Sequence, residues 1–412
     1  MNQYKKCLCY ALCFLLVFSS FSMHALAAAV SANTAGGAAF SDTSEMKYSQ
    51  QNGILVSLGI ISGMPDGTFQ PNRMLSRAEA SVILSRLEGM ENGGERIQLN
   101  DIPAENWASP YAGYCIANGL LKCLDENNFA PGVSITVRDL CRALLMVIGY
   151  RDIQDNQVEA LVSENRLMLG SSLTLDSFVN RDNASLIIYN AINCYEIAEW
   201  QDGKPVYYTD DLLNPVTVLE HRYHAVKYSA MVEANELADL KVNGGFLAQG
   251  QTRLKDHSVF KTSTPISLVG HCVDVFVRDG EILGAPQLSP SESSATFHSL
   301  VEYGAFFGEH SQFSIAKDAK YYLSYNLSTE KAIWTSADRI TITVIDYDCN
   351  GSFETILVNP YYRGTVVSLK PFEVQFTNGK KVELKSYSGA TDLALEDTVY
   401  VLQLANSWVI EK

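Results

Sequence analysis

Basic residues are scarce in this sequence, and no run of them occurs. The 412 residues include 31 lysines and arginines against 46 aspartates and glutamates, and the formal net charge is −15. Nucleic-acid phosphates are bound by clustered lysine and arginine side chains. The composition therefore argues against nucleic acid as a partner.

Long apolar runs are absent after the first residues, so the sequence predicts no membrane span. The N-terminus differs, because two lysines precede a mostly apolar stretch over residues 8–18, and small residues follow at Ala25 and Ala27. This order is typical of a secretory signal peptide, which we place at residues 1–27, with a linker over residues 28–39. The sequence thus predicts an exported chain.

Cysteines with the spacing of a zinc site are also missing. Nine cysteines occur, and three of them fall in the predicted signal peptide. The other six are Cys115, Cys123, Cys141, Cys194, Cys272 and Cys349. An even number in an exported chain permits disulfides, with Cys115 and either Cys141 or Cys123 as candidates. Because these residues stand among apolar neighbours, we expect small core thiols instead.

Catalytic signatures are absent as well. There is no nucleophile elbow, no phosphate loop, and no Cys–His or carboxylate pair that sequence alone can bring together. We therefore predict a protein that is not an enzyme and that uses no cofactor and no metal. Residues 346–354 imitate the first nine positions of a calcium loop, but Leu357 stands where a bidentate glutamate belongs. The Asn350-Gly351 pair between two apolar segments favours a hairpin turn.

What the sequence does contain is an internal repeat. Residues 59–79 are followed sixty residues later by a similar segment, in which Gly119 and Phe129 match Gly59 and Phe69. A third, weaker copy follows. Repetition at a fixed period indicates that one unit has been copied and that the copies pack together.

Each copy predicts a helix, a long loop and a second helix. Asp66-Gly67 has the chemistry of a turn, since glycine accepts a positive φ. Ser76 is expected to cap the second helix, with a glutamate three residues later to close a capping box. Thr136 and Asn180 occupy the cap position in the other copies. A single helix pair is too small to bury its apolar face, so we expect the three copies to form one helical bundle.

The unit resembles the S-layer homology domain, whose pattern runs from an Asp before a Trp, through Gly-Ile-x-x-Gly and Asp-Gly-x-Phe-x-Pro, to a Thr-Arg-Ala-Glu helix start. In the first copy Asp42 and Tyr48 precede the match, and in the second Asp101 and Trp107 do so at the same separation. The resemblance implies three repeats in tandem. Their predicted bounds are residues 40–94, 95–152 and 153–200.

The resemblance also implies a ligand. Tandem repeats of this family bind a secondary cell-wall polysaccharide that carries pyruvyl groups, and by position Arg77 and Arg181 would meet the pyruvate carboxylate. A guanidinium near a helix N-terminus can bind a carboxylate through two hydrogen bonds. Trp107 and Tyr48 would offer flat faces to a sugar ring. The second copy departs from the pattern, with Val137 where the arginine is expected. A structural ion pair for Arg77 and helix packing for the aromatics are the alternatives.

From about residue 204 the pattern changes to short runs rich in Val, Ile, Tyr and Phe, ended by pairs such as Asp279-Gly280 and Asn378-Gly379. Such pairs are preferred centres of two-residue hairpins, so we expect an all-β C-terminal region. Two segments share a faint outline and predict β-rich domains at residues 201–290 and 291–412, each a small closed or half-closed β-barrel, since a barrel removes exposed strand edges. Chance similarity between β-rich segments is the alternative.

Together these features predict an exported, non-catalytic cell-surface protein of a bacterium, located in the cell wall or S-layer. The repeats would bind secondary cell-wall polysaccharide noncovalently, and the β-rich module would be displayed outward. Two alternatives stay open. Drifted repeats could serve as an interaction scaffold for other envelope proteins, or the β-rich half could be a wall-anchored glycan hydrolase with two opposed carboxylates.

Overall fold

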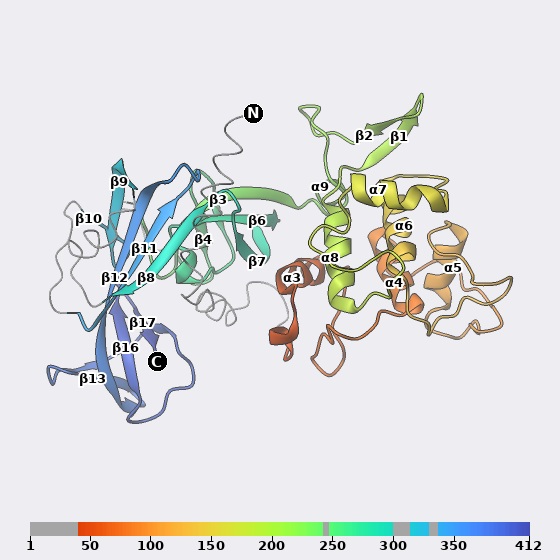
Figure 1. Ribbon diagram of the computed structural model, residues 1–412. Coiled ribbons are helices and arrows are strands. Elements are labelled where there is room, and N and C mark those ends of the chain that lie inside the picture. Colours follow the sequence, from red (N-terminus) through yellow and green to blue (C-terminus); the bar gives the residue numbers. More distant parts are fainter. Residues whose placement is uncertain (1–39, 242–246, 300–313, 329–336) are drawn as a thin grey trace. The chain divides into compact units, whose positions relative to one another are not determined.

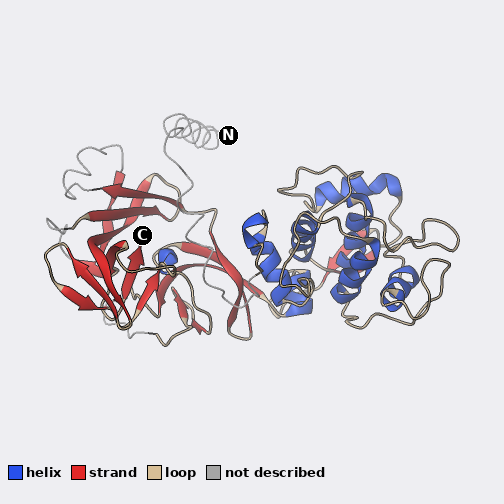
Figure 2. Ribbon diagram, turned by 90° about the horizontal axis from the view of Figure 1, so that it is seen from below, coloured by secondary structure: helices blue, strands red, loops and turns tan. Residues whose placement is uncertain are grey.

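The computed structural model describes residues 40–412, except 242–246, 300–313 and 329–336 (Figure 1). Helices dominate the N-terminal part of the chain and strands the C-terminal part (Figure 2). The predicted signal peptide and linker lie outside the described residues. Within the described ranges, no helix is long and apolar enough to cross a membrane.

The helices of the N-terminal part begin where the predicted caps stand. Ser76 Oγ accepts a hydrogen bond from Glu79 N at 3.2 Å, and Thr136 Oγ1 accepts one from Asp139 N at 3.1 Å. Asn180 caps the third such helix in the same way. These caps satisfy amides that have no partner inside the helix, so the predicted starts are confirmed. The bounds are η1 (Thr43–Glu45), α3 (Ser49–Ser57), α4 (Arg77–Leu87), α5 (Ser109–Ala117), α6 (Val137–Ile148), η2 (Asp155–Gln157), α7 (Val158–Glu164) and α8 (Arg181–Ile192).

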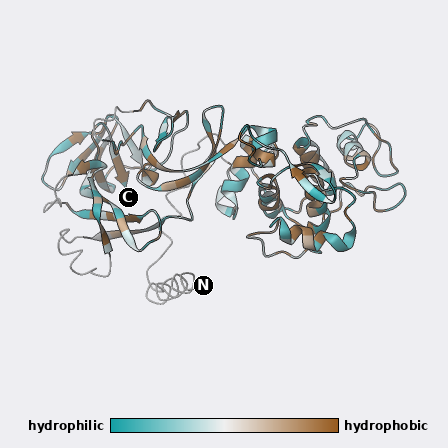
Figure 3. Ribbon diagram, turned by 90° about the horizontal axis from the view of Figure 1, so that it is seen from above, coloured by the Kyte–Doolittle hydropathy of each residue, from teal (hydrophilic) through white to brown (hydrophobic). Residues whose placement is uncertain are grey.

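These helices pack across the boundaries of the predicted repeats, and the assignment of all three segments to one bundle of S-layer homology repeats stays a prediction. The first helix of each repeat contacts the second helix of another: α5 contacts α4, α7 contacts α6, and α3 contacts α8. Both hydrophobic and hydrophilic residues occur on the helices and on the strands (Figure 3). The apolar faces of the helices meet in one buried cluster that contains Phe69, Phe129 and Leu144.

Three short segments before α4, α6 and α8 are joined in a closed ring of hydrogen bonds. Leu75 N donates to Val179 O, Val179 N to Ile135 O, and Ile135 N to Leu75 O, over 2.9, 3.2 and 2.9 Å. All three side chains are buried. Each segment thus donates to one neighbour and accepts from the other, which ties the three repeats together at a single place.

Two cysteines lie in the helical core, as predicted for small core residues. Cys115 and Cys141 are fully buried, and burial raises the pKa of each thiol to about 12. Cys349 is exposed. No disulfide joins the cysteines in the described part of the chain.

Thiol labelling checks this arrangement. The thiolate is the reactive form, so we expect a maleimide at neutral pH to label Cys349 rapidly and to reach Cys115 and Cys141 only after denaturation. Mass spectrometry of digested, labelled protein would measure this. The variant Cys349→Ser should lose the fast phase, whereas rapid labelling of Cys115 or Cys141 in the native protein would contradict the buried core.

The C-terminal part is built from strands, as predicted. Its predicted hairpin turn at Asp279-Gly280 is confirmed by positive φ angles of 54° and 78°. A short helix, α9 (Val218–Tyr223), and a 3-10 turn, η3 (Ile266–Leu268), interrupt the strands. The strand bounds are β1 (Ile197–Gln201), β2 (Lys204–Tyr207), β3 (Val226–Asn235), β4 (Thr252–Leu254), β5 (Val259–Phe260), β6 (Cys272–Arg278), β7 (Glu281–Leu288), β8 (Ser293–Ser299), β9 (Ser314–Leu323), β10 (Asn326–Ser328), β11 (Arg339–Asp346), β12 (Ser352–Leu369), β13 (Phe372–Phe376), β14 (Lys381–Glu383), β15 (Tyr387–Gly389), β16 (Thr398–Gln403) and β17 (Trp408–Glu411).

The described strands form open sheets, so the predicted pair of β-barrels is not confirmed. Strands β1 and β2 form a hairpin, β3–β7 form a five-stranded sheet in the order β5-β4-β3-β6-β7, and the remaining strands form a branched sheet around β12. The long strand β12 pairs through its first half with β9 and β11, and through its second half with β13 and β16. β12 therefore lies in the interior of both halves of this sheet, between β9 and β11 and then between β13 and β16, and the described strands close neither half into a barrel.

The two predicted β-rich domains share one apolar core. Val232 and Val273 of the five-stranded sheet belong to the same buried cluster as Ile345 and Leu357 of the larger sheet. Gly270 takes part in this contact, because a side chain there would meet Leu357 Cδ1 at 3.0 Å. The packing therefore continues across the predicted boundary at residue 290.

Candidate functional site

The three junctions between the repeats place the arginines of the family motif. The amide of the first residue of each second helix donates to the loop of the next repeat: Arg77 N to Val133 O, Val137 N to Ser177 O, and Arg181 N to Arg73 O, each over 2.9 Å. Positions 77, 137 and 181 are thus equivalent. Each lies where one repeat meets another.

Arg181 of the third repeat reaches into the loop of the first. Its Nε donates to Phe69 O at 2.8 Å and its Nη2 to Ser62 O at 2.7 Å, and its guanidinium lies 4.7 Å from the centre of the Phe69 ring. The residue is 6 % exposed, and burial lowers the pKa of the guanidinium. Asp42 holds the same loop from the other side, because its carboxylate accepts from Phe69 N and Gln70 N.

Arg77 of the first repeat repeats this geometry in the loop of the second. Its Nε donates to Phe129 O at 2.8 Å, its Nη2 donates to Lys122 O, and the guanidinium lies 4.8 Å from the centre of the Phe129 ring. The residue is 3 % exposed, and burial lowers its pKa, while Asp139, 3.8 Å from Nη1, opposes that shift. Glu79 instead bonds Arg73. The structural contact of Arg77 is therefore to a neighbouring repeat.

The third junction lacks both partners of this contact. Val137 stands in place of the arginine, and Leu173 stands where the other loops have Phe69 and Phe129. An open groove of about 600 Å³ lies here, which we call the 2–3 groove. It is lined by Arg138, Glu159, Val162, Ser163, Arg166, Met168, Leu169, Ser171, Leu173, Thr174, Leu175 and Asp176.

The 2–3 groove combines two guanidinium groups with apolar side chains. Arg138 Nε and Nη2 donate to Asp176 Oδ1 at 3.1 and 3.0 Å, and the Asp176 side chain is 82 % exposed. Arg166 is exposed, on the turn after α7, with a φ of 53°. An exposed ion pair contributes little to stability, so Arg138 can exchange Asp176 for another anion at small cost. Two carboxylates, of Glu159 and Asp176, also line the groove, so an acidic ligand would bind Arg166 and would take the place of Asp176 at Arg138.

The two predicted aromatic residues lie in different environments. Tyr48 is 8 % exposed, and its hydroxyl donates to Gly170 O of the third repeat at 2.9 Å, which is the helix-packing alternative. Trp107 is 57 % exposed, in the turn before α5, and keeps an open face. Since Arg77 and Arg181 lie at different junctions, the structure does not gather the predicted residues at one place. A ligand contact by any of these residues stays a prediction.

Sequence reasoning missed Arg166, because the third copy matches the repeat pattern poorly in its loop. Arg138 follows Val137, one place after the position where the motif has its arginine. The calcium-like segment folds as a turn in which Asp346, Asp348 and Glu354 have carboxylate oxygens within 4.8 Å of one another. The oxygens of Asp346 accept hydrogen bonds from the amides of Asn350 and Gly351.

Comparison with known proteins identifies the repeat. The family model described as the S-layer homology domain matches residues 53–81, which cover most of α3, the long loop and the start of α4. The chain contains an S-layer homology domain. Its match ends inside the helix that Ser76 caps, so it includes Arg77 and the loop around Phe69.

The relatives of this S-layer homology protein are surface proteins. A "Cell surface protein" of Thermoanaerobacter kivui is 21 % identical over 97 % of this chain and 52 % of its own length. A "Cellulosome-anchoring protein" of Acetivibrio thermocellus is 35 % identical over 34 % of this chain and 29 % of its own. A "Surface layer protein" of Brevibacillus choshinensis is 22 % identical over 31 % of this chain and 12 % of its own. The protein is therefore a secreted protein of the cell wall or S-layer, and it spans about half of the first relative and less of the other two.

Proposed function

We propose that the S-layer homology repeats hold this protein noncovalently on a secondary cell-wall polysaccharide that carries pyruvyl groups, and that the β-rich half is a non-catalytic module displayed from it. Support for anchoring comes from the family match and from a relative whose name describes an anchoring protein. The observation that carries the proposal is the 2–3 groove, which is lined by Arg138 and Arg166 together with apolar side chains.

The chemistry of the groove suits such a ligand. A pyruvyl group adds a carboxylate to a sugar ring, and a guanidinium binds a carboxylate through charge-assisted hydrogen bonds. The apolar side chains of Met168 and Leu175 can pack against the C–H face of the ring. Arg77 and Arg181 already donate to carbonyl oxygens, so we assign them the role of shaping the junctions around the loops that they hold.

Binding by groove variants tests this assignment. We expect Arg166→Ala and Arg138→Ala each to weaken binding to purified pyruvylated wall polysaccharide by about tenfold to a hundredfold, because a hydrogen bond to a charged group contributes about 1.5–3 kcal/mol. Isothermal titration calorimetry of the chain without residues 1–27 would measure the affinity.

The matched control is Arg363→Ala, which removes an exposed arginine from β12, outside the groove. It should bind like the unchanged protein. Equal affinity of the unchanged protein and the three variants would show that the groove is not part of the binding site. If none of them binds, the repeats serve as a scaffold for other envelope proteins, which is the alternative.

A further inference from the structure

The β6–β7 hairpin packs against helices of two different repeats. Phe276 of β6 and Leu283 of β7 belong to the same buried cluster as the helical core. The Phe276 ring lies edge-on to Tyr189 of α8, with 6.0 Å between the ring centres. Arg278 Nη2 donates to Ser57 O, the last residue of α3, at 3.1 Å. One hairpin thus contacts both the first and the third repeat.

Two glycines allow strand β7 and helix α3 to approach closely. Gly284 has a φ of 65°, and a Cβ there would lie 2.9 Å from Ile54 Cγ1 and 3.1 Å from Ile54 N. A Cβ on Gly53 would lie 3.6 Å from Gly284 Cα. The backbone conformation and the contact each favour glycine at position 284. This part of the sheet is therefore fitted to α3.

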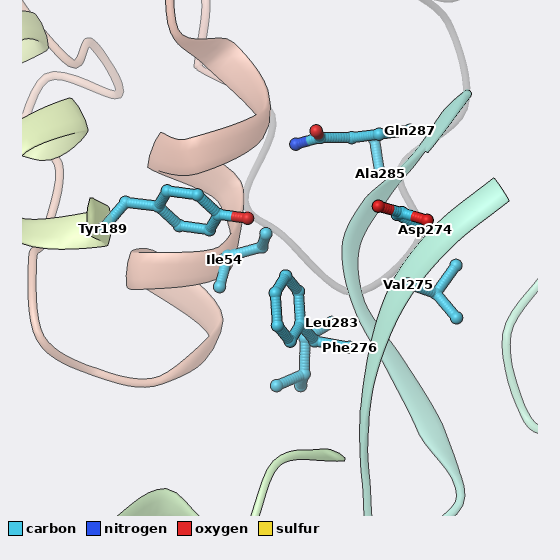
Figure 4. A pocket seen from close by; sticks show the side chains of 8 residues that line it. All are labelled: Ile54, Tyr189, Asp274, Val275, Phe276, Leu283, Ala285 and Gln287. Atoms are coloured by element: carbon cyan, nitrogen blue, oxygen red, sulfur yellow. The ribbon is translucent and has the colours of Figure 1, made fainter. Parts of the chain in front are cut away.

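A small cavity lies in the same contact, between polar and apolar side chains. It measures about 20 Å³ and is lined by Tyr189, Asp274 and Gln287 together with apolar residues (Figure 4). The Tyr189 hydroxyl points toward the two strands, and Gln287 Nε2 is buried without a hydrogen-bond partner in the described protein. A cavity of this size holds one water molecule, which needs two to four polar partners.

Helix α3 occupies a special place in the series of repeats. The contacts of α5 with α4 and of α7 with α6 join helices that follow one another in the chain, but α3 and α8 are far apart in sequence. Their junction is held by Asp182 of α8, whose carboxylate accepts from Lys47 N at 2.9 Å and from Asn52 Nδ2 at 2.7 Å. The junction is therefore held by noncovalent contacts, and the hairpin packs against both α3 and α8.

We propose that the β6–β7 hairpin, with one bound water between Tyr189, Asp274 and Gln287, is a brace that holds α3 on α8 and so closes the ring of repeats. The five-stranded sheet is then part of the anchoring module, and only the larger sheet is displayed beyond it. A movement imposed on the hairpin would pass directly to the junction that contains Arg181. This inference does not depend on which ligand the repeats bind.

Hydrogen exchange of the chain without residues 1–27, followed by mass spectrometry, tests the brace. Gly284→Ala adds a side chain that must displace Ile54, and we expect exchange in peptides covering 49–57 to become at least tenfold faster, with α4 and α6 unchanged. The matched control is Gly280→Ala, which has a similar φ of 78° but no atom within 4 Å of the added Cβ. It should leave the exchange of α3 as it is.

A milder variant keeps the test decisive if Gly284→Ala does not fold. Arg278→Ala removes the bond to Ser57 and leaves the apolar contact in place, and it should speed exchange at the C-terminal end of α3 about threefold. Unchanged protection of α3 in the folded variants would overturn the brace, and so would equal effects of Gly284→Ala and Gly280→Ala.

Discussion

Replacing Arg222 by alanine lowers the free energy of unfolding of the helical part by about 3–5 kcal/mol. Arg222 lies on α9 and reaches the ends of two core helices: Nη1 donates to Leu87 O at 3.0 Å, and Nη2 donates to Val147 O at 2.8 Å. Its guanidinium also lies 2.7 Å from Glu196 Oε1. The Glu196 side chain is 5 % exposed, so the alanine variant leaves a buried carboxylate without its main cationic partner.

The loss also affects the helix ends. Carbonyl groups at the C-terminus of a helix have no partner inside it, and a cation there is favourable for the helix dipole. One side chain that caps both α4 and α6 therefore fixes their ends relative to each other. His221 Nδ1 contacts Glu196 Oε2 at 2.8 Å, and its ring stacks on Tyr208, so it cannot replace the fork of the arginine.

Thermal unfolding followed by far-ultraviolet circular dichroism measures this effect. A loss of this size corresponds to a melting temperature lower by about 10 °C for a domain of this length. Arg222→Lys keeps the positive charge but lacks the planar guanidinium, so its melting temperature should lie between those of Arg222→Ala and the unchanged protein. The exposed arginine in Arg363→Ala serves as the control, which should stay within about 0.5 kcal/mol. A melting temperature of Arg222→Ala equal to that of the control would show that the cluster contributes nothing to stability.

The second large effect is expected for Arg181→Ala, at about 3–4 kcal/mol. The substitution removes two charge-assisted hydrogen bonds to Phe69 O and Ser62 O and the contact with the Phe69 ring. The carbonyl oxygens are left inside the junction between the third and first repeats. Because the fold then changes, loss of polysaccharide binding in this variant would not by itself identify a ligand contact.

Comparing Arg181 with an exposed arginine separates the two roles. Chemical denaturation should show Arg181→Ala strongly destabilised and Arg166→Ala close to the unchanged protein, whereas binding should weaken in Arg166→Ala. If Arg181→Ala unfolds at the same denaturant concentration as the unchanged protein, its hydrogen bonds are not structural, and direct ligand binding by Arg181 becomes the better explanation.

The local features of the helical part could be predicted from the sequence because they depend on neighbouring residues. Ser76 and Thr136 predict helix starts because their side chains can cap the first amides. Asp279-Gly280 predicts a hairpin because its backbone favours a two-residue turn. The partners of Arg77 and Arg181 could not be predicted in this way, since they are carbonyl groups of another repeat. Carbonyl oxygens carry no sequence signature.

The sheets show the same limit. Short runs rich in Val, Ile, Tyr and Phe predict strands, but they do not predict that β12 is shared by two halves of an open sheet. The 2–3 groove could not be predicted either, because its lining combines Arg138 of α6 with residues 159–176, which are distant from it in the sequence. Only the fold brings these segments to one junction.

The most direct test of the anchoring proposal is co-sedimentation of the chain without residues 1–27 with purified cell-wall sacculi, before and after chemical removal of the pyruvyl groups. We predict that the protein pellets with untreated sacculi and stays in the supernatant after the treatment. Equal pelleting with both preparations would contradict recognition of the pyruvyl group, and no pelleting with either would contradict anchoring through wall polysaccharide.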